Sequence, residues 1–86
     1  RSESEVELLW TAWMPDGRSL VALEEGHRSL SIFGPDLQET DRVDLPARIK
    51  EPWGSATVGN QVLIEDSKTD SLWRLDLGTK RWKRIY

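Results

Sequence analysis

The sequence contains no cysteine and a single histidine, His27. Without cysteine no disulfide can reinforce a small core, and one histidine cannot build a multi-histidine metal site. No apolar run approaches the ~20 residues that a membrane-spanning helix needs. We therefore predict no metal, no cofactor and no membrane association. The absence of cysteine is compatible with a cytoplasmic or an exported protein, so the compartment stays open.

Helical periodicity is also nearly absent from these 86 residues. Turn-forming stretches such as Pro15-Asp16-Gly17, Glu25-Gly26, Gly34-Pro35-Asp36 and Leu45-Pro46 recur instead. Their spacing of roughly 8–12 residues is typical of hairpins in an all-β domain. Segments rich in β-branched, aromatic and leucine residues lie between them. We predict no helix and eight strands, near residues 7–13, 19–24, 29–34, 41–45, 55–58, 61–66, 71–76 and 81–85.

A shift of 42 residues aligns the second half of the chain with the first. The matched pairs include Gly17 with Gly59, Leu20 with Val62, Leu30 with Leu72 and Phe33 with Leu75. Removal of Gly34-Pro35 changes the shift to 40, which then aligns Leu45 with Ile85. The repeat predicts two copies of one four-stranded unit. The predicted parts are a flexible N-terminal segment, residues 1–6, and two units, residues 7–46 and 47–86.

Two segments resemble the blades of β-propeller proteins. Residues 71–82, SLWRLDLGTKRW, resemble the kelch-type blade ending, aromatic-x-hydrophobic-Asp-x-x-Thr-x-x-Trp. Residues 12–20, AWMPDGRSL, resemble the Trp-x-Pro-Asp-Gly-x-x-Leu opening of TolB-like and WD40-like blades. The resemblance implies an all-β fold of two four-stranded antiparallel propeller-type blades.

Two blades do not close a ring, because propellers use roughly four to eight. Three arrangements would cover the exposed blade faces: a cyclic homo-oligomer such as a trimer, further blades of a longer chain, and a small β-sandwich or barrel. Residues 1–46 carry 4 basic and 10 acidic side chains, whereas residues 47–86 carry 8 and 5. This asymmetry favours head-to-tail self-association. The plan also resembles two-blade lectins that trimerise, which implies a glycan as an alternative ligand.

Few residues are arranged for catalysis. Glu24-Glu25 and Asp66 occupy equivalent strand ends and offer paired carboxylates, but strand ends before turns are usually solvated. His27 has no cysteine and no serine motif beside it, so it does not indicate a catalytic triad. We predict that the protein is not an enzyme.

The five tryptophans suggest binding or packing. Trp10 and Trp13 are an odd number of positions apart on one strand, so they face opposite sides of a sheet. Tryptophan platforms with arginine donors suit a sugar or a protein partner. The candidate binding residues are Trp10, Trp53, Trp73, Arg48 and Arg74. The candidate packing or interface residues are Trp13, Trp82, Leu45 and Ile85.

The basic segment Lys80–Tyr86 is expected to protect a sheet edge rather than to bind nucleic acid, with Arg81 and Lys83 outward and Trp82 and Ile85 inward. Together these patterns predict a non-enzymatic β-propeller interaction module that acts through self-assembly and through protein or ligand binding. The alternative is a lectin-like carbohydrate-binding module.

Overall fold

The computed structural model describes residues 8–24, 26 and 28–86. The predicted flexible segment 1–6 and the loop residues Glu25 and His27 lie outside these described residues. The regular elements are β1 (Leu8–Trp13), β2 (Leu20–Glu24), β3 (Ser29–Phe33), β4 (Glu39–Asp44), β5 (Pro52–Val58), β6 (Gln61–Asp66), β7 (Ser71–Asp76) and β8 (Arg81–Arg84).

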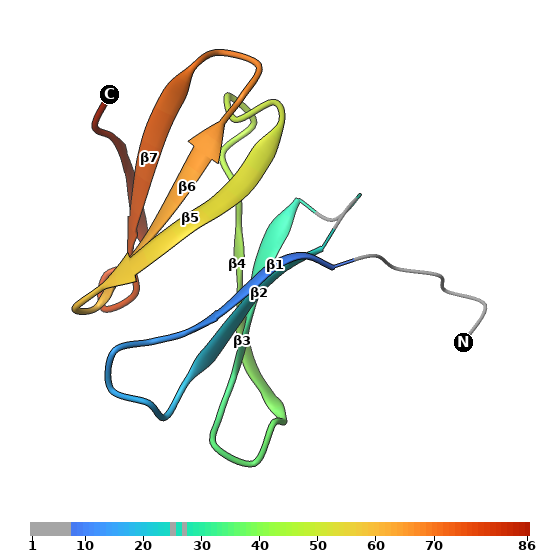
Figure 1. The fold of residues 1–86 in the computed structure, drawn as a ribbon, viewed down its shortest axis with the longest axis vertical. Helices are drawn as coiled ribbons and strands as arrows, with labels where there is room; N and C mark the ends of the chain where they lie inside the picture. Colours follow the sequence, from blue (N-terminus) through green and yellow to red (C-terminus); the bar gives the residue numbers. More distant parts are fainter. Residues whose placement is uncertain (1–7, 25, 27) are drawn as a thin grey trace.

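The strands form two four-stranded antiparallel sheets (Figure 1). Sheet 1 has the order β1-β2-β3-β4 and sheet 2 the order β5-β6-β7-β8, so each sheet is a meander of neighbouring hairpins. No described residue is helical. The prediction of an all-β fold with two four-stranded antiparallel sheets is confirmed. Two packed sheets are compatible with a pair of propeller-type blades and with a small sandwich.

Two strands are longer than the sequence predicts. β5 begins at Pro52, three residues before the predicted start at 55. Proline has no N–H to give to a ladder, but at the first residue of an edge strand this loss costs little. β4 begins at Glu39 because the preceding turn closes early, with the Leu37 N–H bonded to the Gly34 carbonyl at 2.9 Å.

The two sheets share the register that the repeat predicts for their central hairpins. Each pair of opposite residues in β2 and β3 recurs 42 positions later in β6 and β7. These pairs are Leu20–Phe33 with Val62–Leu75, Val21–Ile32 with Leu63–Arg74, and Ala22–Ser31 with Ile64–Trp73.

The predicted change of shift in the fourth strands is wrong. Asp41 lies opposite Ile32 and Lys83 opposite Arg74, so the shift of 42 continues. The equivalent of Ile85 is therefore Val43 rather than Leu45. The β3–β4 connection has five residues, 34–38, and the β7–β8 connection has four, 77–80. The register shift between Ile32 and Phe33 accommodates this difference, so the alignment needs no two-residue gap.

Alternation along the strands gives each sheet two faces, which we call face A and face B. Face A carries Val21, Leu23, Leu30 and Ile32 in sheet 1 and their equivalents Leu63, Glu65, Leu72 and Arg74 in sheet 2. Face B carries Leu20, Ala22, Ser31 and Phe33 in sheet 1 and their equivalents Val62, Ile64, Trp73 and Leu75 in sheet 2.

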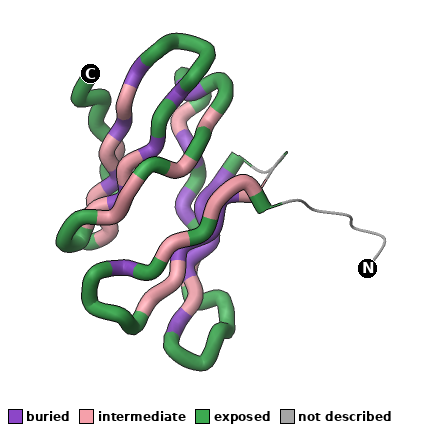
Figure 2. Tube along the Cα trace, viewed as in Figure 1, coloured by how far each residue is buried: buried purple, intermediate pink, exposed green. Residues whose placement is uncertain are grey.

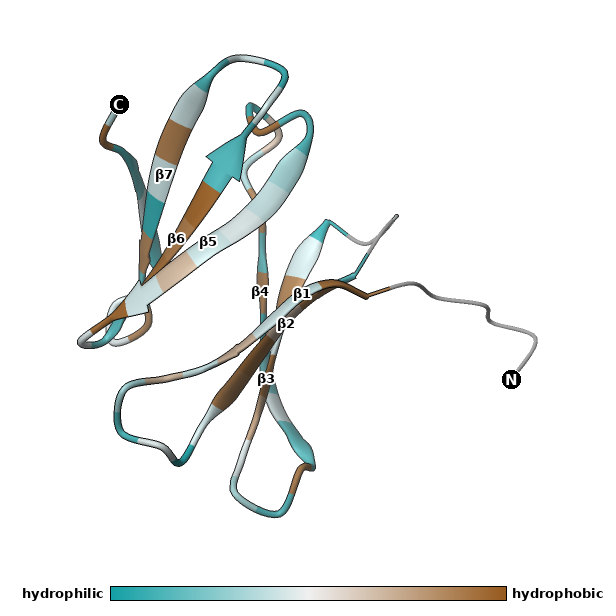
Figure 3. Cartoon of the chain, in the orientation of Figure 1, coloured by the Kyte–Doolittle hydropathy of each residue, from teal (hydrophilic) through white to brown (hydrophobic). Residues whose placement is uncertain are grey.

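The hydrophobic core forms between unlike faces, face A of sheet 1 and face B of sheet 2. Buried residues line the middle strands of both sheets (Figure 2), where hydrophobic residues also concentrate (Figure 3). Full burial of one such aliphatic side chain contributes about 1.5–3 kcal/mol. The core comprises Met14, Val21, Leu23, Leu30, Ile32, Val43, Leu45, Ile49, Val62, Ile64, Trp73 and Leu75.

The linker between the sheets, residues 45–51, is fixed along its length. The Leu45 N–H donates to the Arg28 carbonyl at 2.7 Å, and the Ile49 side chain is fully buried. The Lys50 and Glu51 N–H groups donate to the Asp66 carboxylate at 2.9 and 3.0 Å. The linker is therefore anchored to both sheets, and its Leu45 and Ile49 side chains belong to the core.

Candidate interaction surfaces

Trp10 joins the two sheets. It lies opposite Leu23, on face A, and its indole ring packs against Gly54 of β5. A Cβ at Gly54 would overlap this ring, so only glycine permits the approach. Trp10 packs against the core rather than offering an open platform. Trp13 lies opposite Leu20 on face B and is 53% exposed, so the two tryptophans face opposite sides, as their spacing predicts.

Trp73 is buried, with 7% exposure, and offers a ligand little surface. The indole Nε1–H donates to Ser71 Oγ at 3.0 Å, and the Ser71 and Thr69 hydroxyl oxygens are 2.6 Å apart. Thr69 in turn donates to the Asp66 carboxylate at 2.8 Å. Because an ionised carboxylate only accepts, these hydroxyls are aligned from Trp73 to Asp66. Trp73 is therefore a core residue with a fixed polar atom.

Asp66 is fully buried and ionised. Burial raises the pKa of its carboxyl, but hydrogen bonds from the Lys50, Glu51 and Lys68 backbones and from Thr69 outweigh burial and lower the pKa to about 2. Catalytic general acids need raised carboxyl pKa values instead. The carboxylate at this predicted strand end thus holds the linker and the β6–β7 turn together.

Side chains beyond the core also connect the sheets. Trp82 packs against the core, and its Nε1–H donates to the Asp44 carbonyl of β4 at 2.9 Å. Lys80 pairs with Asp41, and this ion pair lowers the pKa of the Asp41 carboxyl. The Thr57 hydroxyl donates to the Trp13 carbonyl at 2.9 Å. Leu45, a candidate packing residue, is 6% exposed in the linker.

Face A of sheet 2 is open in the part of the chain that the structure describes. Trp53, Val58 and Ile85 are 47%, 60% and 44% exposed on it, and Leu72 and Arg74 are half-buried. The inward orientation predicted for Ile85 is wrong, because the register places it on the side of Lys83, while Arg84 lies opposite the buried Trp73. Ile85 and the candidate binding residue Arg74 therefore belong to one open surface.

Face B of sheet 1 is the second uncovered surface. Thr11 and Trp13 are exposed on β1, and Leu20 and Phe33 are half-buried beside them. The small side chains at its centre, Ala22 and Ser31, are buried. Arg42, which pairs with Glu39 at 2.9 Å, also donates to Ser29 Oγ at 3.3 Å on the same face. The hydrogen bond from Arg42 lowers the pKa of the Glu39 carboxyl.

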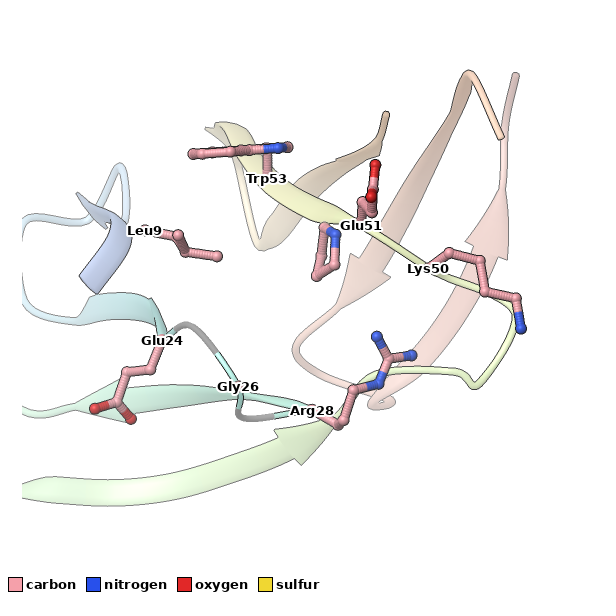
Figure 4. A pocket seen from close by; sticks show the side chains of 8 residues that line it. Leu9, Glu24, Gly26, Arg28, Lys50, Glu51 and Trp53 are labelled. Atoms are coloured by element: carbon pink, nitrogen blue, oxygen red, sulfur yellow. The ribbon is translucent and has the colours of Figure 1, made fainter. Parts of the chain in front are cut away.

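A pocket of about 520 Å³ lies where β1 and β5 begin (Figure 4). The Leu9 side chain extends into the pocket below the ring of Trp53 in this view, and Leu9, Pro52 and Trp53 form its apolar lining. Glu24, Arg28, Lys50 and Glu51 also line it, with the charged ends of Glu24 and Lys50 directed away from its centre. The Arg28 guanidinium also donates to the Pro46 carbonyl at 2.8 Å. The pocket thus combines one aromatic face with donors and acceptors.

A smaller pocket of about 330 Å³ brings two candidate binding residues together. The Arg48 guanidinium lies over the Trp73 ring, 5.8 Å from its centroid. Lys50 and Arg84 line the same pocket. The arginine covers the ring, so the pair acts as a cation–π contact that closes the core edge.

No family model, curated protein or solved structure matches this chain. Among residues 8–24, 26 and 28–86, no helix has the length and apolar character that a bilayer crossing requires. In the same part of the chain, no three His, Cys, Asp or Glu side chains are grouped to hold a metal ion.

Proposed function

We propose that the chain is a non-enzymatic interaction module, a pair of β-propeller-type blades that associates with a second copy of itself. The observation that carries this proposal is the packing of unlike faces. Face A of sheet 1 covers face B of sheet 2, and this leaves one face of each kind open. By the shared register, the open face A of sheet 2 is equivalent to the face A that sheet 1 buries in the core. The open face B of sheet 1 is likewise equivalent to the face B that sheet 2 buries there.

Packing of unlike faces has a different consequence from packing of like faces. Two equivalent sheets that cover each other through like faces complete their interaction. Unlike faces give a heterologous contact, which repeats until a ring closes or a filament grows. Three copies supply six blades, within the range of known propellers.

The open faces carry residues that suit an interface. Trp53, Val58 and Ile85 are exposed on face A of sheet 2, and Trp13 is exposed on face B of sheet 1. Tryptophan is enriched among the residues that contribute most to binding energy. In the core, residues at equivalent positions of the other sheet are already buried. Val43, the equivalent of Ile85, is 7% exposed.

Sedimentation equilibrium tests this proposal. We expect a concentration-dependent mass that approaches an integral multiple of the chain mass, three copies for a six-bladed ring. A folded, monodisperse monomer over the whole range from micromolar to millimolar concentration would contradict self-association.

A second candidate function is carbohydrate binding at the pocket of Figure 4. The observation that favours it is the exposed ring of Trp53 beside the charged groups of Arg28 and Glu51. Sugars stack on such rings and bond to such groups. A glycan array would detect a bound sugar, and Trp53→Ala should abolish that signal while Trp13→Ala, equally exposed but outside the pocket, retains it. An array without signal removes this candidate.

A further inference from the structure

We infer that the self-association proposed above places Trp53 of one copy over Thr11 of the next, as Trp10 lies over Gly54 within the chain. This inference rests on the proposed function and specifies its contact. It commits to a second copy as the partner and to a head-to-tail arrangement in which β5 of one copy lies beside β1 of the next.

The equivalence of the residues follows from strand pairing. Trp10 lies opposite Leu23 and Trp53 opposite Glu65, and these partners are 42 positions apart. Direct alignment at a shift of 42 places Trp10 on Pro52 instead. β-Bulges in β1 and β5 occur at different points, which displaces the two edge strands relative to each other.

Gly54 and Thr11, the positions over which the two tryptophan rings lie, are equivalent by the same comparison of strand partners. Gly54 lies opposite Ile64 and Thr11 opposite Ala22, again 42 positions apart. Gly54 receives the ring of Trp10, whereas Thr11 is exposed in the described part of the chain. The Trp53 side chain is 47% exposed on the opposite open face. The Trp53 ring on one open face and the Thr11 position on the other therefore remain without the contact that Trp10 and Gly54 make.

Thr11, the position proposed to receive the Trp53 ring, differs from Gly54 in size. Thr11 has a Cβ and a methyl group where Gly54 has neither, so the ring of Trp53 lies higher above β1 than the ring of Trp10 lies above β5. The contact between copies is accordingly looser than the contact within the chain. This difference makes the contact between copies reversible at concentrations where the chain itself stays folded.

The charges of the two open faces are complementary. Face A of sheet 2 carries three cations against two carboxylates: Arg74, Arg81 and Lys83 against Glu65 and Asp76. Face B of sheet 1 carries three carboxylates against one cation: Glu24, Glu39 and Asp44 against Arg42. Complementary signs favour contact between unlike faces and oppose contact between like faces.

A mixing experiment tests the inference. Trp53→Arg blocks face A of sheet 2, and Thr11→Arg blocks face B of sheet 1. Each variant alone should be monomeric under conditions where the wild type associates. An equimolar mixture should form a 1:1 dimer and nothing larger, because only one intact face of each kind remains. Leu37→Arg, an exposed leucine in the β3–β4 turn, is the matched control and should associate like the wild type.

The other outcomes separate the inference from the proposed function. A monomeric wild type contradicts both. Variants that associate like the wild type leave self-association standing but overturn this contact. Dimers of one variant alone indicate like-face contact and overturn the head-to-tail arrangement, as does a mixture that stays monomeric. Circular dichroism verifies folding, and Val58→Arg or Trp13→Arg, both at exposed positions of the same faces, replaces a variant that fails to fold.

Discussion

Asp66 shows how one buried charge organises this small protein. Its carboxylate accepts the N–H groups of Lys50, Glu51 and Lys68 and the hydroxyl of Thr69. A buried carboxylate without such donors would take a proton instead. The residue therefore ties the linker to the β6–β7 turn as long as it stays ionised.

Acid should weaken the fold through Asp66. Its pKa is about 2 in the folded chain, below the ordinary value of 3.8, so its contribution is complete above pH about 4 and disappears as the pH falls through about 2. A shift of this size corresponds to about 2 kcal/mol. Urea unfolding at several pH values should show a shallower loss below pH 4 for Asp66→Asn than for the wild type, and a lower stability at pH 7.

Asp70→Asn provides the matched control in the same turn. Asp70 has a φ of 58°, a conformation that asparagine also adopts, so this change should alter stability by less than about 0.5 kcal/mol. An acid dependence of Asp66→Asn equal to that of the wild type would contradict the assigned role.

Much of the strand pattern is readable from the sequence, because turn residues and β-branched segments act locally. β6 and β7 begin and end where the turn signals place them. The start of β5 was not readable. Pro52 and Gly54 are typical of loops, and only the approach of the Trp10 ring from another strand explains a glycine inside β5. Such a contact is not encoded in any short segment.

The contact between β1 and β5 should depend on Gly54. Gly54→Ala introduces a methyl group into the space of the Trp10 ring, and such overpacking typically costs about 1–3 kcal/mol. In a Trp10→Ala background the same change should cost much less. A double-mutant cycle in urea measures this coupling, and additive effects of the two changes would contradict the assigned contact.

The candidate tryptophans fall into two groups, those packed within the chain and those exposed on the open faces. Tryptophan identifies a side chain that needs a large apolar neighbour, but not whether that neighbour lies in the same chain. Trp10, Trp73 and Trp82 find it within the chain, whereas Trp13 and Trp53 remain about half exposed. The face of each residue depends on bulges and register, which the sequence pattern alone does not specify.

For the whole molecule, the acidic first half and the basic second half become two open faces of opposite sign. Lys83→Glu should weaken self-association about two- to five-fold, since a charge at an interface rim contributes up to about 1 kcal/mol. Lys68→Glu, in the β6–β7 turn, is the control with the same change in net charge. Sedimentation in low salt gives both dissociation constants, and equal values would contradict a role for the face charges.

The anchored linker sets the geometry of any larger assembly. Hydrogen bonds to Arg28 and Asp66 hold residues 45–51 at both ends, and Ile49 is buried between them. The angle between neighbouring sheets is therefore a built-in property of one chain rather than an adjustable hinge. If copies repeat that angle, the linker determines the curvature of the ring, and with it the number of subunits at which the ring closes.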